Sequence, residues 1–252
     1  MPDTPKRAGA PINPLSEGES FNDDRFLAAV ACAYRAGVGA DLAPGARLYS
    51  PPILAVYDLG VLGFSNSVVW RCPTRLILDH YNAHVSDRHL DVGVGTGYFL
   101  DHCIFPARDP ALTLMDLNPH SLTMATRRVR RYHPTSLLAD VTILARPRTA
   151  SFDSIGINYL LHCLPGPMSD KGAAIGHLAT LLKPGGVLFG TTILGQGAQH
   201  GRLARAFLRI YNQRGVFGNT DDSVQGLTDA LAPHFSMVSV HVVGSVAFFA
   251  AR

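Results

Sequence analysis

The stretch His89–Leu100 constrains the fold of this 252-residue chain more than any other segment. The apolar residues Leu90 and Val92 alternate with other side chains, and three glycines follow at once, at positions 93, 95 and 97. This pattern predicts a buried strand, a sharp turn and the start of a helix. Because the first turn of a helix presents unpaired backbone N–H groups, we expect a nucleotide-like ligand at the carboxyl end of a first parallel strand.

The spacing of the glycines separates two kinds of nucleotide site. A dinucleotide fingerprint requires G-x-G-x-x-G, whereas this loop has G-x-G-x-G, with the bulky Tyr98 where the third glycine of that fingerprint would lie. From Asp91 to Gly97 the loop resembles motif I of the class I S-adenosylmethionine-dependent methyltransferases. The resemblance implies S-adenosylmethionine as the cofactor.

Apolar segments alternate with helical segments after this loop. Strands are expected at 112–116, 137–140, 152–158 and 187–192, with helices that begin at Pro119 and at Ser169-Asp170, and a turn at 183–186. This alternation predicts a doubly wound parallel sheet. Asp221 and Asp222 are expected to cap a further helix.

The end of the chain differs from this pattern. Two apolar segments, 235–243 and 246–251, are separated only by Gly244-Ser245, so they must pair as an antiparallel hairpin. Together the segments predict an α/β fold with a seven-stranded, mostly parallel sheet and a C-terminal antiparallel hairpin. This arrangement resembles the Rossmann-like methyltransferase sheet.

Acidic residues lie at three successive strand ends. Asp116, at the end of the second strand, is expected to accept hydrogen bonds from both ribose hydroxyls, since a carboxylate is a bidentate acceptor. Asp140 or the Val141 amide is expected to contact the adenine edge. By resemblance, Asp91 approaches the methionine end. The full set of expected cofactor-binding residues is Asp91, Gly93, Gly95, Gly97, Asp116, Leu117, Asp140, Val141 and Asn158.

The segment Asn158–Pro165 resembles the part of the family that contacts methionine and faces the methyl acceptor. It lacks the N/D-P-P-Y/F motif of the methyltransferases that act on nucleic-acid amino groups. The segment Leu181–Leu188 resembles the late motif of the small-molecule branch, which includes ubiquinone, menaquinone and natural-product methyltransferases. The resemblance extends from His89 to Arg252.

The region before the glycine loop gives weaker expectations. Residues 1–20 are expected to be a disordered tail, residues 21–86 a helical cap across the carboxyl edge of the sheet, and residues 87–252 the cofactor-binding domain. Tyr57, Trp70 and Tyr81 of the cap, together with His162, are expected to line the acceptor site. The alternative for the three cap aromatics is that they only pack the cap onto the core.

Methyl transfer needs chiefly the alignment of acceptor and donor, with a general base where the acceptor carries a proton. His162, just past the fourth strand, is the best-placed base by sequence, and a hydrogen-bonding wall residue is its alternative role. His200 is a weaker candidate. An extra helix is expected within 195–219, which either closes the acceptor site or forms a homodimer contact.

Composition narrows the kinds of partner, metal site and cellular location that can be expected. The net charge is +3 and the charged fraction is 16%, which does not require a nucleic-acid partner. The basic run 127–131 is interpreted as a solvated helix face. The four cysteines show no metal or redox spacing, no apolar run reaches membrane-spanning length, and no signal core begins the chain, so a cytoplasmic protein without a metal is expected.

These patterns predict an enzyme that transfers a methyl group from S-adenosylmethionine to a small, partly apolar metabolite. Two alternatives stay open from the sequence: an RNA or protein methyltransferase, and a non-catalytic cofactor-binding regulator or partner subunit with the same fold.

Overall fold

The computed structural model describes residues 65–144 and 150–252. The tail predicted over 1–20, most of the predicted cap and its Tyr57 lie outside the described residues. Among the helices of the described ranges, none is long and apolar enough to cross a membrane.

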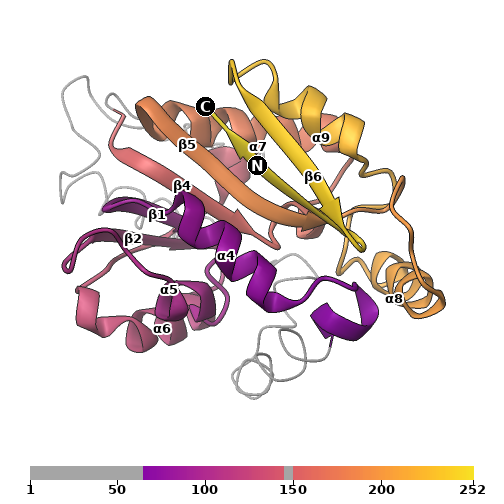
Figure 1. Ribbon diagram of the computed structural model, residues 1–252, viewed down its shortest axis with the longest axis horizontal. Helices are drawn as coiled ribbons and strands as arrows, with labels where there is room; N and C mark the ends of the chain where they lie inside the picture. Colours follow the sequence, from indigo (N-terminus) through magenta and orange to yellow (C-terminus); the bar gives the residue numbers. More distant parts are fainter. Residues whose placement is uncertain (1–64, 145–149) are drawn as a thin grey trace, which may run out of the picture.

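The described chain forms one seven-stranded sheet in the order β3-β2-β1-β4-β5-β7-β6 (Figure 1). The first five strands are parallel, and β7 pairs antiparallel with both β5 and β6. The predicted fold class is therefore confirmed, including the C-terminal hairpin. The strands are β1 (Arg88–Val92), β2 (Ala111–Asp116), β3 (Thr135–Leu138), β4 (Phe152–Asn158), β5 (Leu182–Ile193), β6 (Val238–Val243) and β7 (Val246–Ala251).

Helices cover both faces of the sheet (Figure 1). One face carries α4 (Thr74–His84), α5 (Tyr98–His102) and α6 (Pro119–Arg128), and the opposite face carries α7 (Met168–Leu181) and α9 (Val224–Leu231). The inserted helix α8 (Arg202–Gln213) falls within the expected range 195–219. Short 3-10 turns follow α6, β3 and β4, at η2 (Arg130–Tyr132), η3 (Val141–Ile143) and η4 (Leu161–Cys163).

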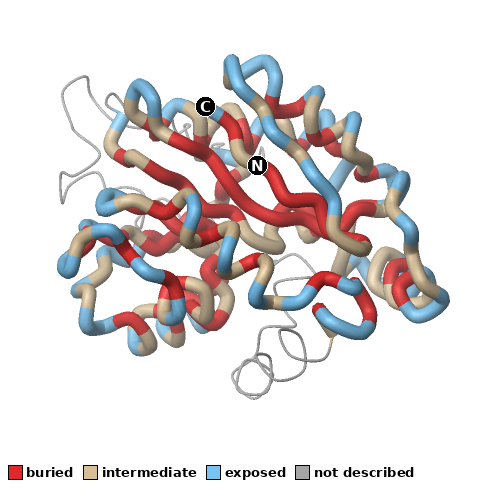
Figure 2. The backbone as a smooth tube through the Cα atoms, viewed as in Figure 1, coloured by how far each residue is buried: buried red, intermediate tan, exposed pale blue. Residues whose placement is uncertain are grey.

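The central strands are buried along most of their length, as Figure 2 shows. Leu90 and Val92 of β1 face the α7 side, whereas Leu112 and Leu114 of β2 face the α5–α6 side. Because these strands are buried on both faces, their sequences are short continuous apolar runs.

Three predicted helix and turn boundaries are wrong. Helix α9 is capped by Ser223, whose side chain accepts from the Gly226 N–H, and not by Asp221 or Asp222. Helix α7 begins at Met168 after Pro167, one residue before the predicted cap. The predicted turn 183–186 is an irregularity inside β5, where the pairing with β4 jumps from Leu182 to Val187.

Helix α4 also lies elsewhere than predicted. It does not cross the carboxyl edge of the sheet as part of a cap, but packs on the sheet face against β5 and β7. Ile77 and Tyr81, four residues apart on one side of the helix, are both fully buried. The apolar surface of β5 and β7 gives this side of the helix its partner, so burial of that surface fixes its position.

Candidate functional site

Two adjoining cavities lie at the carboxyl ends of β1, β2 and β4. The larger has a volume of about 220 Å³ and reaches from the glycine loop to the ends of β2 and β3. The smaller, about 40 Å³, follows the glycine loop into α5. Both are lined by Gly93, Gly95, Asn158 and Tyr159, so they form one continuous site. Each of the nine residues that the sequence assigns to the cofactor lines one cavity or both.

The three glycines all have positive φ, between 52° and 75°. A side chain at Gly97 would meet the Ala125 backbone at 3.0 Å, because α6 packs directly on the loop there. At Gly95 an added Cβ would have no atom within 4 Å. Gly97 is thus required by packing, whereas Gly95 keeps the floor of the cavity clear for a ligand.

Arg128 of α6 holds the glycine loop from below. Its guanidinium donates to the carbonyl oxygen of Thr96 at 3.1 Å and to the Thr96 hydroxyl at 3.0 Å. The same side chain lies 3.8 Å from Asp101, which also pairs with Arg131. Two arginines of the basic run 127–131 therefore stabilise the loop and α5.

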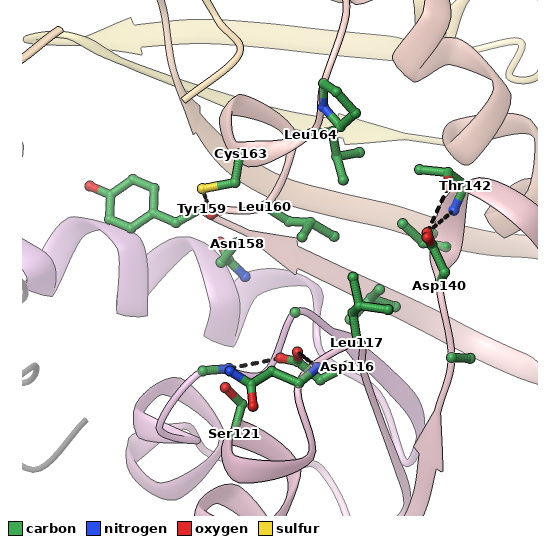
Figure 3. A pocket seen from close by; sticks show the side chains of 17 residues that line it. Asp116, Leu117, Ser121, Asp140, Thr142, Asn158, Tyr159, Leu160, Cys163 and Leu164 are labelled. Carbon is green, nitrogen blue, oxygen red and sulfur yellow. Dashed lines mark hydrogen bonds between the residues drawn. The ribbon is translucent and has the colours of Figure 1, made fainter. Parts of the chain in front are cut away.

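Asp116 ends β2 with its carboxylate in the larger cavity (Figure 3). One oxygen accepts from the Asn118 N–H at 2.8 Å, and the other from the Gly95 N–H at 3.4 Å. Burial raises the pKa of Asp116 from 3.8 to about 6, although these two amide hydrogen bonds act in the opposite direction. The carboxylate is only partly satisfied and can accept further hydrogen bonds from a ligand.

Asp140 lies on the far side of the same cavity from Asn158 (Figure 3). Its Oδ1 accepts from the Thr142 N–H at 2.8 Å and from the Thr142 hydroxyl at 2.7 Å, which caps η3. These bonds fix the orientation of the carboxylate and place the Val141 backbone at the cavity wall.

Asn158 ends β4 between the two cavities. Its side-chain oxygen accepts from the Thr191 hydroxyl at 3.1 Å, but its buried Nδ2 has no hydrogen-bond partner in the described parts of the chain. In Figure 3 this nitrogen points into the space above Asp116. A buried donor without an acceptor is costly, so the site is chemically complete only when a ligand supplies one.

Sequence reasoning placed the segment Asn158–Pro165 beside the methionine part and the acceptor, but it did not predict the turn that brings the apolar side chains of this segment to the cavity. Tyr159 has a positive φ of 57°, a rare conformation for a non-glycine residue, and it turns the chain from β4 across the cavity. The residues that follow line the wall: Leu160, Cys163, Leu164 and Pro165. Burial raises the pKa of the Cys163 thiol to about 12, so it acts as an apolar wall group. Asn118, Ser121 and Thr142 were also missed, and their only sequence signal is that each closely follows a strand-end acid.

The structure does not support His162 as a general base. The side chain is 3% exposed and lines neither cavity. Its Nδ1 lies 3.3 Å from the Ile193 N–H, which can only donate, so Nδ1 is the acceptor nitrogen and Nε2 carries the proton. Burial lowers the pKa of His162 to about 3, which keeps the ring neutral with its one basic nitrogen already used.

Trp70 and Tyr81 are also not at the ligand surface. Trp70 is 2% exposed and packs against Phe207 and Phe217. Tyr81 is fully buried beneath the smaller cavity, where its hydroxyl contacts Asp91. Aromatic residues at helical spacing have the same pattern whether they face a ligand or the core, and here the core is their partner. His200 lines neither cavity, and its Nδ1 lies 3.0 Å from the Ser245 hydroxyl.

No group of three or more His, Cys, Asp or Glu side chains within 65–144 and 150–252 is arranged to hold a metal ion. The groups that line the cavities include backbone N–H groups, carboxylates, the amides of Asn118 and Asn158, the hydroxyls of Ser121 and Thr142, and an apolar wall.

Comparison with known proteins agrees with this geometry. A family described as a methyltransferase domain matches residues 90–188. The demethylluteothin O-methyltransferase of Streptomyces thioluteus is 38% identical over 199 residues, which cover 78% of this chain and 86% of that protein. The physcion biosynthesis cluster O-methyltransferase of Aspergillus chevalieri is 37% identical over 209 residues, covering 82% and 94%.

A solved structure shows the same fold at much lower sequence identity. The DhpI–SAH complex has a TM-score of 0.61 at 17% identity, over 83% of this chain and 95% of that one. The two curated relatives favour neither the RNA or protein alternative nor the non-catalytic one. The chain belongs to the class I S-adenosylmethionine-dependent methyltransferases and is a member of their small-molecule branch.

Proposed function

We propose that this enzyme methylates a hydroxyl oxygen of a small, partly apolar metabolite, with the cofactor in the two adjoining cavities. The assignment of the cofactor to these cavities rests on one observation. The Asp116 carboxylate lies opposite Nδ2 of Asn158, which has no hydrogen-bond partner in the described parts of the chain, above the glycine loop. Oxygen as the acceptor atom is supported by two relatives that are named O-methyltransferases. A small-molecule acceptor is supported by the same two relatives, whereas the apolar wall formed by Leu160, Leu164 and Pro165 lines the larger cavity, which the cofactor occupies in this proposal.

The residues present fit S-adenosylmethionine. Asp116 supplies a bidentate acceptor for the ribose hydroxyls, and the Asp140–Val141 edge faces the adenine. The open space beside Gly95 lets the ligand lie close to the main chain of the loop. Asp91 lines the smaller cavity and is the acceptor for the amino group of the methionine part, whereas Asn158 Nδ2 donates to an acceptor beside it. Leu117 contributes apolar contact next to Asp116.

S-adenosylmethionine, when bound, supplies a methyl group that is already activated by its sulfonium. The task of the protein is therefore alignment, which contributes about 7–11 kcal/mol in well-oriented reactions. Three glycines with fixed positive φ and a loop held by Arg128 provide a rigid floor for that alignment. The side chains after Tyr159 exclude water from one side. His162 takes no part in proton transfer, because its one basic nitrogen already accepts a hydrogen bond from the Ile193 N–H.

The partners that we propose follow from the same surfaces. We propose a small-molecule acceptor and no nucleic-acid partner, since Arg128 and Arg131 of the basic run are engaged with Thr96 and Asp101 and so have a structural role within the chain. Helix α8 is linked to the segment after β4 through Phe217, which packs on Tyr211 of α8 at a centroid distance of 4.9 Å and on His162 at 4.6 Å. A homodimer through the exposed Leu203 is the alternative for α8, and light scattering of the purified protein distinguishes the two: a monomer excludes the dimer contact.

The test has two steps. First, calorimetry with S-adenosylmethionine and separately with NADH should show binding of the first alone, and binding of NADH alone overturns the cofactor assignment. Second, the enzyme is incubated with ¹³C-methyl-labelled S-adenosylmethionine and a panel of hydroxylated aromatic and pyrone compounds, each beside its preformed methyl ether. The chemical shift of the transferred carbon should identify an O-methyl group in the hydroxylated compounds only. Label on nitrogen or carbon would contradict the oxygen assignment.

A further inference from the structure

A chain of five polar groups, four of them buried and the last, Ser86, partly exposed, connects Asp91 at the cavity to the opposite end of β1. Asp91 Oδ2 lies 2.7 Å from the Tyr81 hydroxyl, which lies 2.7 Å from Nε2 of His89. Nδ1 of His89 lies 2.8 Å from the Ser154 hydroxyl, which in turn lies 2.7 Å from the Ser86 hydroxyl and 2.9 Å from the Ser86 N–H. The chain links α4, β1 and β4 beneath the glycine loop.

The hydrogen-bond inventory fixes the direction of every proton in this chain. An ionised Asp91 can only accept, so the single Tyr81 hydroxyl proton is donated to it. The Tyr81 oxygen must then accept from His89, which places the imidazole proton on Nε2 and leaves Nδ1 as an acceptor. Ser154 therefore donates to Nδ1, and its oxygen accepts from Ser86. Every donor in the chain points toward Asp91.

Apolar rings seal the middle of the chain. His89 and Tyr81 are both 0% exposed, and Phe189 lies against both rings at centroid distances of 5.8 and 5.2 Å. Phe99 stacks on Tyr81 at 6.0 Å and Phe105 lies edge-on to His89 at 6.3 Å. Burial and the neighbouring Asp91 raise the pKa of Tyr81 well above its ordinary value, so its proton stays in place. In such surroundings each hydrogen bond is stronger than it would be in water.

We propose that Tyr81 is a positioning residue for cofactor binding: it holds Asp91 Oδ2, so that Oδ1 faces the methionine end of S-adenosylmethionine. His89 and Ser154 act through Tyr81, because the tautomer that they impose forces the Tyr81 proton toward Asp91. This inference rests on the proposed contact between Asp91 and the cofactor. It gives a role to two side chains, Tyr81 and His89, that touch no ligand.

A double-mutant cycle tests the coupling between the two residues. Tyr81→Phe removes one oxygen and keeps the ring, and should raise the Kd for S-adenosylhomocysteine about tenfold, as expected for loss of a hydrogen bond to a charged group. In an Asp91→Ala background the same change should have no further effect, because Tyr81 acts only through Asp91. With saturating S-adenosylmethionine, the kcat of Tyr81→Phe should stay near that of the parent while its KM rises.

The control is Tyr132→Phe, which removes a tyrosine hydroxyl beside the same core cluster but far from Asp91, and should leave the Kd unchanged. Thermal melts confirm that each variant is folded. If Asp91→Ala does not weaken binding, the proposed role of Asp91 itself fails. If Asp91→Ala weakens binding and folded Tyr81→Phe does not, or if the two effects simply add, the positioning role of Tyr81 is overturned.

A spectroscopic test needs neither cofactor nor turnover. Nitrogen-15 NMR of the histidines, with His89→Gln to assign the signal, should show a proton on Nε2 of His89 and an acceptor nitrogen at Nδ1. In a separate binding measurement, Ser154→Ala, which removes the donor to Nδ1, should weaken cofactor binding although Ser154 lines neither cavity. A His89 ring protonated on Nδ1 in the parent protein would reverse the proton order and contradict the proposal.

Discussion

The Gly95 N–H donates to Asp116 Oδ2 at 3.4 Å and so joins the glycine loop after β1 to the acid that ends β2. This one contact connects the two parts of the sequence that point to the cofactor. The Asn118 N–H holds the other Asp116 oxygen at 2.8 Å. The carboxylate is therefore fixed by two short loops, and its remaining lone pairs face the larger cavity.

Replacement of Asp116 should separate binding from stability. Asp116→Asn leaves one acceptor oxygen where the ribose needs two, so the Kd for S-adenosylmethionine should rise about 10- to 100-fold. The same change removes a carboxylate whose pKa is raised, but it also places an amide NH2 opposite one of the two backbone N–H donors, so the two effects offset each other and the free energy of unfolding at pH 7.5 should change by less than about 1 kcal/mol. Calorimetry and thermal denaturation measure the two effects. The exposed Asp109→Asn variant serves as the control, and an unchanged Kd in Asp116→Asn would refute the ribose assignment.

The pH dependence of stability should carry the signature of Asp116. Its folded pKa of about 6 exceeds the ordinary value of 3.8, so the native state binds more protons than the unfolded state between these pH values. Its contribution to the free energy of unfolding therefore falls as the pH rises from about 4 to 6.

Two histidines, the partly exposed His80 and the buried His162, act in the opposite direction. Burial lowers the pKa of His80 to about 4 and that of His162 to about 3, so both favour the unfolded state as the pH falls below 6.5. The Asp116 part is isolated as the difference between urea denaturation curves of the parent and Asp116→Asn at pH 4.5, 5.5 and 7. A difference that does not change over this range would contradict the raised pKa.

The glycines of the loop should divide into two classes. Gly95→Ala adds strain from its positive φ, about 1 kcal/mol, but meets no neighbouring atom, so the fold should survive while the new methyl group obstructs the cavity. Gly97→Ala adds a 3.0 Å contact with the Ala125 backbone and should cost both stability and binding. Gly185→Ala, with a φ of 79° and open space, is the matched control for strain alone. Unaltered cofactor affinity in Gly95→Ala would show that the ligand does not approach this loop.

A buried ion pair should hold the segment after α8 in place. Lys171 Nζ lies 2.6 Å from Asp222 Oδ2 and 2.9 Å from the Gly218 carbonyl oxygen, with both side chains fully buried. Lys171→Met leaves the Asp222 charge unpaired and should cost about 3–5 kcal/mol, whereas the double variant Lys171→Met with Asp222→Leu should recover much of that loss. Lys183→Met, at a half-exposed pair with Asp153, should cost less than about 1 kcal/mol. Urea denaturation provides the comparison, and equal costs at the two sites would contradict the burial argument.

Most of the residues that face the cofactor site could be predicted from the sequence. Asp116 and Asn158 each end a parallel strand, and Asp140 follows β3 by two residues. Because parallel strands bring their carboxyl ends to one edge, position along the chain predicts that these residues meet. The resemblance placed the segment after Tyr159 at the site, but which of its side chains line the cavity could not be predicted, because the exposure of Leu160, Cys163 and Leu164 depends on one left-handed turn.

The sequence by itself determined the succession of strands along the chain, the hairpin and the glycine loop, since short apolar runs and glycine-rich turns are local properties of the chain. Only the tertiary structure decided which polar groups find partners. Asp222 resembles a helix cap in the sequence but pairs with Lys171, and Tyr81 resembles a ligand contact but donates to Asp91 from within the core. Local sequence cannot distinguish these roles, because the partner that satisfies a buried polar group comes from another element of the fold.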